Sequence, residues 1–475
     1  MEKVKKKTKI VATVSDASCT SAFIKDLYAA GMDVVRLNTA HQDLDNAKKV
    51  ITIVRSVSDK IPILIDTKGP EIRTIIKGEH AVKTNEVITI SGNAKVPADI
   101  HVTYPYFVAD VSVGHSILID DGDISLIVKR KYKGAVSCIV QNDGIIKNKK
   151  SVNVRGATLH LPSLSEKDKK FISFAAQQQV TFIAHSFVRN KHDVLAVQKI
   201  LNAHKSPIKI IAKIENKEGI DNLDEILDYA YGIMIARGDL GVEIPAEQLP
   251  PLQKAIIKKC IDRKKPVIVA TQMLHSMIQH PRPTRAEVSD VANAIYDGTD
   301  AIMLSGETAY GTYPIAAVET MTKIAMEVES HHVILRPLPQ VPSNNEIVTT
   351  LARSAIIASC DLNTHAIILD TLSGKTARYL ASFRGTNIIY AQCYTPQVMR
   401  ELALSYGIYA DCIPPRKTTD GFVHKVLPSL IRKKWIGPHD LIIIVAGSFG
   451  YCHGASFMEI TTAENMLKGP LRCIV

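Results

Sequence analysis

Short apolar runs rich in β-branched residues recur along the first two-thirds of the chain, and this repeat constrains the fold most. Eight such runs follow one another, and almost every gap between them has the length of about one helix. The runs cover residues 9–14, 34–37, 61–65, 180–184, 208–212, 232–236, 266–270 and 301–304. They are mostly apolar rather than alternating, which is typical of parallel strands buried on both faces. Eight strand–helix units predict an α/β fold, a closed (β/α)8 TIM barrel.

One gap, between the third and fourth runs, is far too long for a single helix. From residue 71 to residue 156 the pattern changes to short strand-like runs separated by the turn signals Asp120-Asp121-Gly122 and Asn142-Asp143-Gly144. We therefore predict a small β-barrel domain inserted after the third barrel strand. An insertion there would lie over the carboxyl ends of the strands, where barrel active sites are found, so a lid is its natural role.

A proline-rich stretch, residues 336–342, predicts a linker after the barrel. Beyond it, apolar runs at 366–369, 387–391 and 441–445 alternate with helical patterns, as in a separate open α/β domain. The expected domains are a catalytic barrel, an inserted β lid and a C-terminal α/β regulatory domain. The barrel would comprise residues 1–70 and 157–335, the lid residues 71–156, and the C-terminal domain residues 343–475.

Composition excludes several classes of protein. No run approaches the roughly 18 apolar residues of a membrane helix, so we expect no membrane partner. The net charge of +11 is not accompanied by basic runs interleaved with aromatics, which make up only 5% of residues. We therefore expect a small anionic substrate and no nucleic acid. Eight widely spaced cysteines without a C-x-x-C pair fit a cytoplasmic protein in a reducing compartment.

Charged residues gather where the fifth and sixth barrel runs end. Lys213 and Glu215 are two residues apart, so both can point the same way from one strand. Asp239 closes the next strand along the chain. Two carboxylates on neighbouring strand ends suit a hard divalent cation, and a lysine beside them suits a phosphoryl group.

The other strand ends continue this pattern, which forms a nearly complete ring on one face. The residues are Arg36, Asn38, His41, Asp66, Thr67, Lys68, His185, Ser186, Arg189, Arg237, Thr271, Gln272, Ser305 and Glu307. Such a ring favours a site for anions and metal over scattered surface residues. Gly238 lets the backbone approach a ligand, and a helical turn starting there would offer free N–H groups to an anion.

Ordinary structural explanations compete for some of these residues. Thr271 could cap a following helix, because threonine is common at that position. Thr284 and Glu287 have the spacing of a capping box, so the basic segment 281–287 could be a loop before a capped helix.

Six motifs resemble the pyruvate kinase family. They are DTKGPEIRT (66–74), KKSVNVRGA (149–157), KIENKEG (213–219), MIARGDLGVEIP (234–245), VATQML (269–274) and PRPTRAEVSDVANAIYDGTDAIMLSGETAYGTYP (281–314). The resemblance implies transfer of the phosphoryl group of phosphoenolpyruvate to ADP, which gives pyruvate and ATP in the last step of glycolysis. It also implies a homotetramer.

The resemblance assigns roles to individual residues. Glu215 and Asp239 match ligands of Mg2+ (or Mn2+), and Lys213 matches the lysine that neutralises the phosphoryl group in flight. Thr271 matches the residue beside the carbon that gains a proton, with Ser305 and Glu307 as possible relay partners. The substrate-binding set is Arg36, Lys213, Gly238, Asp239 and Thr271, and the nucleotide-binding set is Arg73, Lys150 and His41.

The resemblance also implies a monovalent cation. Asn38, Asp66 and the Thr67 carbonyl match ligands of K+, and Glu71 matches the acid that accompanies potassium dependence. Ala40 replaces a serine ligand, so we expect K+ use with one oxygen fewer. A second departure, Ser15-Asp16, replaces the usual Gly-Pro at a nucleotide contact.

A loop in the C-terminal domain resembles one that binds effector phosphates. Its candidate residues are Thr371, Ser373, Lys375 and Thr376, which follow a strand and open a helix. A capped helix start is the ordinary alternative. The later loop 447–454 lacks the usual basic residues, so the expected effector is a sugar monophosphate, fructose 1,6-bisphosphate or none.

Two other functions compete with the kinase. A magnesium-dependent aldolase or lyase acting on a pyruvate enolate would also use a barrel and two acids, but it would not need the lid, Lys213 and Thr271 together. A regulatory relative without nucleotide use is supported only by Ser15-Asp16 and Ala40. The full set of Lys213, Glu215 and Asp239 favours the kinase.

Overall fold

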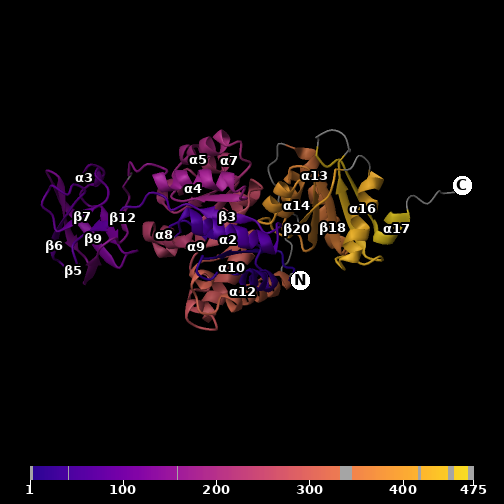
Figure 1. Ribbon diagram of the computed structural model, residues 1–475, viewed down its shortest axis with the longest axis horizontal. Coiled ribbons are helices and arrows are strands. Elements are labelled where there is room, and N and C mark those ends of the chain that lie inside the picture. The colour runs from indigo at the N-terminus through magenta and orange to yellow at the C-terminus, as the bar shows by residue number, and fades with distance from the viewer. Residues whose placement is uncertain are drawn as a thin grey trace.

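Three bodies lie in a row along the longest axis of the molecule (Figure 1). The computed structural model describes residues 4–40, 42–157, 159–331, 345–415, 419–447 and 454–468. The lid is at one end, the barrel is in the middle and the C-terminal domain is at the other end. The predicted linker at 336–342 lies outside the described residues.

The central body is a closed barrel of eight parallel strands, as the repeat of apolar runs predicted. The strands run in the order β1-β17-β16-β15-β14-β13-β3-β2. Their bounds are β1 Lys9–Thr13, β2 Val34–Asn38, β3 Ile63–Asp66, β13 Phe182–His185, β14 Lys209–Ile214, β15 Gly232–Ala236, β16 Val267–Ala270 and β17 Ala301–Leu304. Nearly every strand residue is buried, because side chains fill the barrel on one side and helices cover it on the other.

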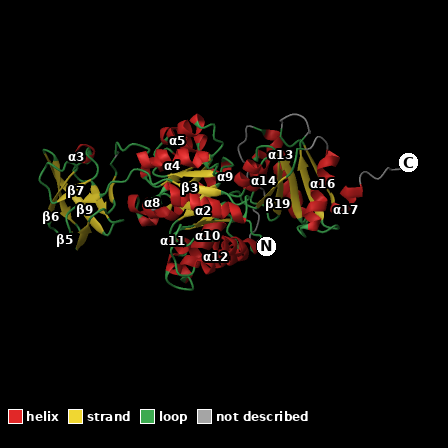
Figure 2. Ribbon diagram, in the orientation of Figure 1, coloured by secondary structure: helices red, strands yellow, loops and turns green. Residues whose placement is uncertain are grey.

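Helices surround the strands (Figure 2), and the longer ones bury an apolar stripe. In α5, for example, Val194, Val197 and Leu201 face the barrel at helical spacing. The helices of this body are α1 Ser21–Ala30, α2 Leu44–Val57, α4 Glu166–Gln177, α5 Lys191–Ala203, α6 Lys217–Asp221, α7 Leu223–Tyr229, α8 Arg237–Glu243, α9 Leu249–Asp262, α10 Arg285–Tyr296, α11 Gly306–Ala309 and α12 Pro314–Ser330, with short 3-10 helices at Ala246–Gln248 and His275–Ile278.

The segment after β3 forms a separate all-β body with its own apolar core. Its sheets have the orders β12-β8-β9-β10-β6-β7-β4 and β11-β5. The strands are β4 Thr74–Ile75, β5 Glu79–Val82, β6 Val87–Ser91, β7 Ile100–Val102, β8 Ser116–Ile119, β9 Ile124–Tyr132, β10 Ala135–Val140, β11 Gly144–Lys147 and β12 Val152–Arg155, with the short helix α3 at Phe107–Asp110. The insertion and its lid position agree with the sequence pattern.

The C-terminal body is an open α/β domain with strand order β20-β19-β18-β21-β22. Its elements are α13 Glu346–Asp361, β18 Ala366–Thr371, α14 Lys375–Ser382, β19 Ile388–Cys393, α15 Pro396–Leu402, β20 Ile408–Cys412, α16 Thr419–Arg432, β21 Leu441–Ala446, β22 Phe457–Thr462 and α17 Ala463–Lys468. The three predicted strands are present. Both edge strands, β20 and β22, were missed, because they are half-buried and lack a continuous apolar run.

The C-terminal domain packs against the amino ends of the barrel strands. Lys9, at the start of β1, donates from Nζ to the carbonyl of Ile408 at 2.6 Å. Asp300, just before β17, accepts from Arg384 Nη2 at 2.8 Å. The lid follows the carboxyl end of β3, so the lid and the C-terminal domain lie at opposite ends of the barrel (Figure 1).

In the described part of the chain, no helix combines the length and the apolarity needed to span a membrane.

Candidate active site

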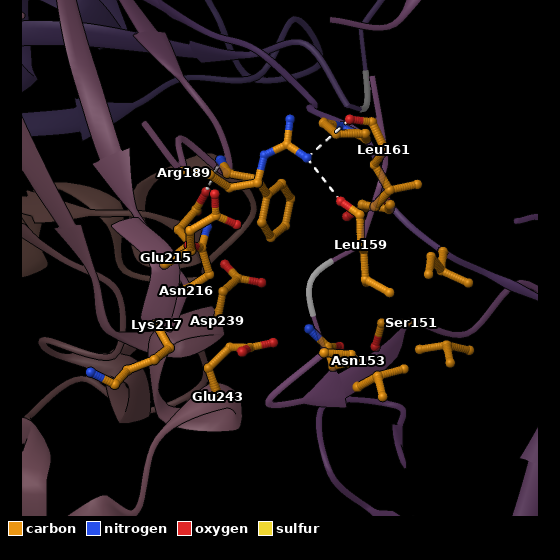
Figure 3. Close-up of a pocket in the computed structure, with 18 of the residues that line it drawn as sticks. Ser151, Asn153, Leu159, Leu161, Arg189, Glu215, Asn216, Lys217, Asp239 and Glu243 are labelled. Carbon is orange, nitrogen blue, oxygen red and sulfur yellow. Dashed lines mark hydrogen bonds between the residues drawn. The ribbon is translucent and has the colours of Figure 1, made fainter. Parts of the chain in front are cut away.

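The carboxyl ends of the barrel strands enclose a cavity with about 860 Å3 of empty volume. Its wall collects polar side chains that sequence spacing had placed at strand ends: Arg36, Asn38, Asp66, Thr67, Lys68, Ser186, Lys213, Glu215, Asp239 and Thr271. A larger cavity between barrel and lid shares the wall residues Glu215 and Asp239 (Figure 3). The two cavities therefore form one site that extends from the barrel mouth under the lid.

Lys213 lies in the wall of the barrel cavity and contacts three of its polar side chains. Its Nζ lies 3.1 Å from Asp66 Oδ1, 3.0 Å from Glu215 Oε1 and 2.8 Å from Ser186 Oγ. Burial alone would lower the pKa of Lys213, but the carboxylates of Asp66 and Glu215 raise it above the usual value. The side chain is therefore held as a fixed positive charge that faces the cavity.

Two carboxyl groups lie together where β14 and β15 end. Glu215 and Asp239 both line the cavity and interact electrostatically, and Figure 3 shows both beside it. Burial raises the pKa of Glu215; with the opposing effect of Lys213 and the added effect of Asp239, it lies at about 7. Burial also raises the pKa of Asp239. Two buried acids this close repel each other when ionised, so a cation between them would stabilise the pair.

Thr271 is held in an unusual backbone conformation directly after β16. Its φ of 68° is in the left-handed region, which a β-branched residue seldom occupies. Its Oγ1 accepts from the Gly238 amide at 2.7 Å and donates to the Ala270 carbonyl at 2.7 Å. Thr271 therefore caps no helix after β16, and the capping alternative is wrong. A helix, α8, does begin at Arg237, as the turn around Gly238 had suggested.

Arg36 and Asp66 form the opposite wall of the cavity. The Arg36 guanidinium contacts Asp66 Oδ2 at 2.7 Å through Nε and at 2.6 Å through Nη2, and it donates to Thr13 at 2.8 Å. Burial would raise the pKa of Asp66, but Lys213 and Arg36 hold it below its usual range. Asp66 thus remains ionised and holds the side chains of Arg36 and Lys213 in place.

The residues expected at the monovalent-cation site offer oxygen atoms on one side of the cavity. Asn38, Ala40, Asp66 and Thr67 all lie in its wall. The Thr67 carbonyl accepts from Ser186 Oγ at 2.6 Å. An amide oxygen, a carboxylate and a carbonyl form a donor set that suits a hard cation.

The lid side of the site carries further charges. Glu71 pairs with Arg73 at 2.6 Å, and Lys150 pairs with Asp120 at 2.6 Å. All four residues line the larger cavity. Arg73 and Lys150, which are expected to bind the nucleotide, thus lie under the lid and form ion pairs with carboxylates in this structure.

Several expected site residues lie elsewhere. Ser305 and Glu307 are outside the walls of both cavities, and Glu307 accepts from the amides of Leu274 at 3.2 Å and Ser305 at 2.8 Å. His41 is outside the described residues. Thr284 and Glu287 do form a capping box, which confirms the ordinary explanation for that segment.

Sequence reasoning missed several residues of the lid–barrel cavity, among them Asn153 and Glu243 (Figure 3). Glu243 could have been found, because it is four residues after Asp239 on one helix and so shares its face. Asn153 lies in a lid strand, and no local signal distinguishes it from its neighbours. His185 was expected at the site, but it is buried outside both cavity walls, with Nδ1 3.3 Å from Thr67 Oγ1.

The site joins a fixed lysine, paired buried acids and arginines at the carboxyl face of a TIM barrel. This set is typical of barrel enzymes that act on phosphorylated anions.

Comparison with known proteins gives the family. Residues 5–318 match the family model described as pyruvate kinase, barrel domain, and residues 349–461 match pyruvate kinase, alpha/beta domain. A pyruvate kinase of Borreliella burgdorferi is 48% identical and covers 98% of this chain and 99% of its own length. One of Geobacillus stearothermophilus is 44% identical over 98% of this chain and 81% of its own.

Solved structures agree with this assignment. A pyruvate kinase from Cryptosporidium parvum superposes with a TM-score of 0.90 at 33% identity and covers 96% of each chain. The chain belongs to the pyruvate kinase family. Its activity is the transfer of the phosphoryl group of phosphoenolpyruvate to ADP in glycolysis, which excludes the lyase and the purely regulatory alternatives.

Proposed function

We propose that the buried cluster around Lys213 performs this phosphoryl transfer. The observation that supports the proposal most is the position of Lys213 Nζ, within 3.1 Å of Asp66 and 3.0 Å of Glu215 in the cavity wall. Two carboxylates keep the amine charged and fixed, so it needs no reorganisation when negative charge develops on the equatorial oxygens. Arg36, held by Asp66, supplies a second fixed positive charge to the same group.

Glu215 and Asp239 are the residues that would hold Mg2+ or Mn2+. Their two carboxyl groups are buried, adjacent and mutually repulsive, and hard divalent cations are bound in proteins by one or two carboxylates plus substrate oxygens. When bound, the cation supplies Lewis-acid stabilisation of negative charge on the substrate. Asn38, Asp66 and the Thr67 carbonyl would hold K+ beside it, with Glu71 nearby.

Thr271 would direct the proton that the enolate gains at carbon. Its hydroxyl lies at the cavity wall and is oriented by the Gly238 amide at 2.7 Å, so Gly238 positions it. A threonine hydroxyl is a weak acid, so a water chain is the expected proton source. Ser305 and Glu307 remain candidates for a proton relay to Thr271.

The nucleotide would bind under the lid. Arg73 and Lys150 line the lid cavity, where their present partners are Glu71 and Asp120. Exchange of these carboxylates for nucleotide phosphates would draw the lid toward the barrel. His41 belongs to the same expected set.

A phosphate effector and a homotetramer complete the proposal. The loop before α14 offers Ser373 and Lys375, both exposed, while the Thr371 hydroxyl accepts from the Gly374 amide at 2.9 Å and Thr376 is buried. α14 begins without a side-chain cap, so amides of its first turn are available to an anion. Cytoplasmic function agrees with the cysteines of the described residues, all of which are free.

The first test is pyruvate formation from phosphoenolpyruvate and ADP, with Mg2+ and K+, for wild type and Lys213→Met. We expect the variant to lose about 10²–10³-fold in kcat, the loss typical when a preorganised charge is removed. Lys258→Met is the matched control, because Lys258 is exposed on α9, pairs with Asp262 and lines neither cavity. Equal activity of Lys213→Met and wild type would refute the proposed role.

A separate test addresses the monovalent cation. We expect pyruvate formation in K+ to exceed that in Na+ or without monovalent salt at equal ionic strength. Full rate without K+ would show that Ala40 and its neighbours form no K+ site.

A further inference from the structure

The chain returns from the lid to the barrel between β12 and α4, and residues 159–165 of this stretch form the return segment. By its side chains this segment belongs to the lid, because Leu159 and Leu161 pack against the apolar lid core. The His160 amide also donates to the lid, to the Tyr104 hydroxyl at 3.0 Å. A movement of the lid therefore carries this part of the segment with it.

One arginine of the barrel, Arg189, holds the main chain of the return segment (Figure 3). Its Nη1 donates to the carbonyls of Leu159 at 3.1 Å and Leu161 at 3.0 Å. Arg189 comes from the loop between the barrel strand β13 and the helix α5. The two leucines thus contact the lid through their side chains and the barrel through their carbonyls, so lid and barrel are joined at this point.

The other nitrogens of Arg189 fix its guanidinium. Nε donates to Asp193 Oδ2 and Nη2 donates to Asp193 Oδ1, both at 3.1 Å, and the Arg189 amide donates to the same carboxylate at 3.0 Å. Asn222 Nδ2 donates to the Arg189 carbonyl at 3.0 Å. A guanidinium bound to a carboxylate at two points keeps a defined orientation, so Nη1 stays directed at the return segment.

Stabilisation of α5 does not account for this arginine. Arg189 lies just before Asn190, the N-cap of α5, and the helix dipole disfavours a cation at that end. Asp193, in the first turn, offsets this cost. What the arginine supplies is a planar fork that binds a carboxylate and still has donors for main-chain carbonyls.

The same loop also supports the outgoing crossing, which leads from β3 to the lid. Gly69 has a φ of 71°, and a Cβ at this position would lie 2.7 Å from the Phe187 ring, so the chain passes directly over the loop. The Phe187 amide donates to Glu215 Oε2 at 2.6 Å, and Ser186 Oγ accepts from Lys213 Nζ at 2.8 Å. Both lid crossings and two residues of the barrel cavity therefore contact one short loop.

We propose that Arg189 is a positioning residue that fixes the orientation of the lid relative to the barrel cavity. The inference rests on the proposed binding of the nucleotide under the lid. Arg73 and Lys150, the expected nucleotide ligands, lie on the lid side of the site, whereas Arg36 and Lys213 belong to barrel strands. Loss of the Arg189 contacts should therefore weaken productive binding of ADP more than that of phosphoenolpyruvate.

The test is steady-state kinetics of pyruvate formation, with ADP and phosphoenolpyruvate varied separately. We expect Arg189→Lys to raise the KM for ADP about tenfold, as loss of charge-assisted hydrogen bonds does, and to change the KM for phosphoenolpyruvate less than about twofold. A lysine keeps the charge but lacks the fork that binds Asp193 and both carbonyls together. Asp193→Asn, which releases the guanidinium, should act in the same direction and replaces Arg189→Lys if that variant does not fold.

Arg55→Lys is the matched control. Arg55 Nη2 also donates to main-chain carbonyls, those of Gln178 and Gln179, but these residues precede β13 at the amino end of the barrel. Arg55→Lys should keep both KM values of wild type. A purely structural role of Arg189 would lower kcat through loss of folded enzyme and would leave the KM for ADP unchanged, which would overturn the proposal.

Hydrogen–deuterium exchange examines the same contact without nucleotide. Amides of the return segment should exchange faster in Arg189→Lys than in wild type, and Arg55→Lys should exchange as wild type does.

Lys150→Met separates this inference from the proposed nucleotide site. If Lys150→Met raises the KM for ADP and Arg189→Lys does not, the role of Arg189 is overturned. If neither variant raises it, the nucleotide does not bind under the lid, and exchange of the return segment decides. Faster exchange in Arg189→Lys then supports Arg189 as the residue that orients the lid, and exchange equal to that of wild type overturns it.

Discussion

A strained threonine shows how single residues position the reacting groups. Thr271 has a φ of 68°, and such backbone strain costs roughly 1–3 kcal/mol unless neighbours over-determine it. Arg237 is one such neighbour, since its Nη2 donates to the Thr271 carbonyl at 2.9 Å while Nη1 pairs with Asp290 at 2.7 Å. The guanidinium fork therefore connects the Thr271 backbone to α10.

We predict that Arg237→Lys lowers kcat for pyruvate formation about tenfold with a smaller change in the KM for phosphoenolpyruvate. A lysine keeps the charge but cannot hold Asp290 and the Thr271 carbonyl together. Steady-state kinetics check this, and Arg263→Lys, the same change at an exposed surface pair, should leave both constants unchanged. An Arg237→Lys enzyme with wild-type kcat would show that Arg237 does not position Thr271.

At the scale of elements, α8 connects the lid to the acid pair. Asp239 lies near its start, and its end contacts the lid strand β12, where Arg155 Nε donates to the Val242 carbonyl at 2.5 Å. Glu243 and Asn153 of the same strand line one cavity (Figure 3). A movement of the lid strand β12 would therefore also displace α8, the helix that carries Asp239.

The pH dependence of the free energy of unfolding should reveal the raised pKa of Glu243. Burial raises its pKa from 4.5 to about 7, so between these values the folded state binds an extra proton and the free energy of unfolding falls as pH rises. The glutamine side chain of the Glu243→Gln variant cannot ionise. The free energy of unfolding of this variant, relative to that of wild type, should therefore rise by about 2–3 kcal/mol between about pH 5 and about pH 8.

Urea unfolding of the chain without Mg2+ or substrates measures this gain. The exposed Glu247→Gln is the control and should follow wild type at both pH values. A difference between Glu243→Gln and wild type that does not change with pH would contradict the prediction.

At the scale of the whole molecule, the barrel and the C-terminal domain share buried charges. Asp300 accepts from Arg384 at 2.8 Å, from the Tyr406 amide at 2.9 Å and from the Val267 amide at 3.1 Å. Lys60 and Asp411 also connect the two bodies, at 2.7 Å, but Lys60 is 48% exposed. The buried Arg384–Asp300 pair should contribute more to stability than the Lys60–Asp411 pair, because water screens only the exposed pair.

We predict that Arg384→Met destabilises the protein by about 3–5 kcal/mol, since it leaves Asp300 buried without its cation. Lys60→Met should cost less than about 1 kcal/mol. Thermal unfolding compares the two variants, and the double variant Asp300→Asn/Arg384→Met should lose less than the sum of its single changes. Similar losses for Arg384→Met and Lys60→Met would contradict the argument.

Much of the fold could be predicted because strand period, buried runs and turn signals are local properties. All eight barrel strands were found, two of them, β15 and β17, with the observed bounds. The edge strands β20 and β22 were not found, because an edge strand is half exposed and its sequence resembles a loop. Tertiary pairing with β19 and β21, rather than local preference, makes them strands.

The sequence by itself determined the ring of charged residues at the strand ends, because parallel strands of a barrel end on one face. Lys213, Glu215 and Asp239 follow from this rule. Only the tertiary structure decided which of the ring residues meet in one cavity and that Glu307 binds main-chain amides instead. Those contacts join residues far apart in the chain, and their geometry depends on how whole bodies pack.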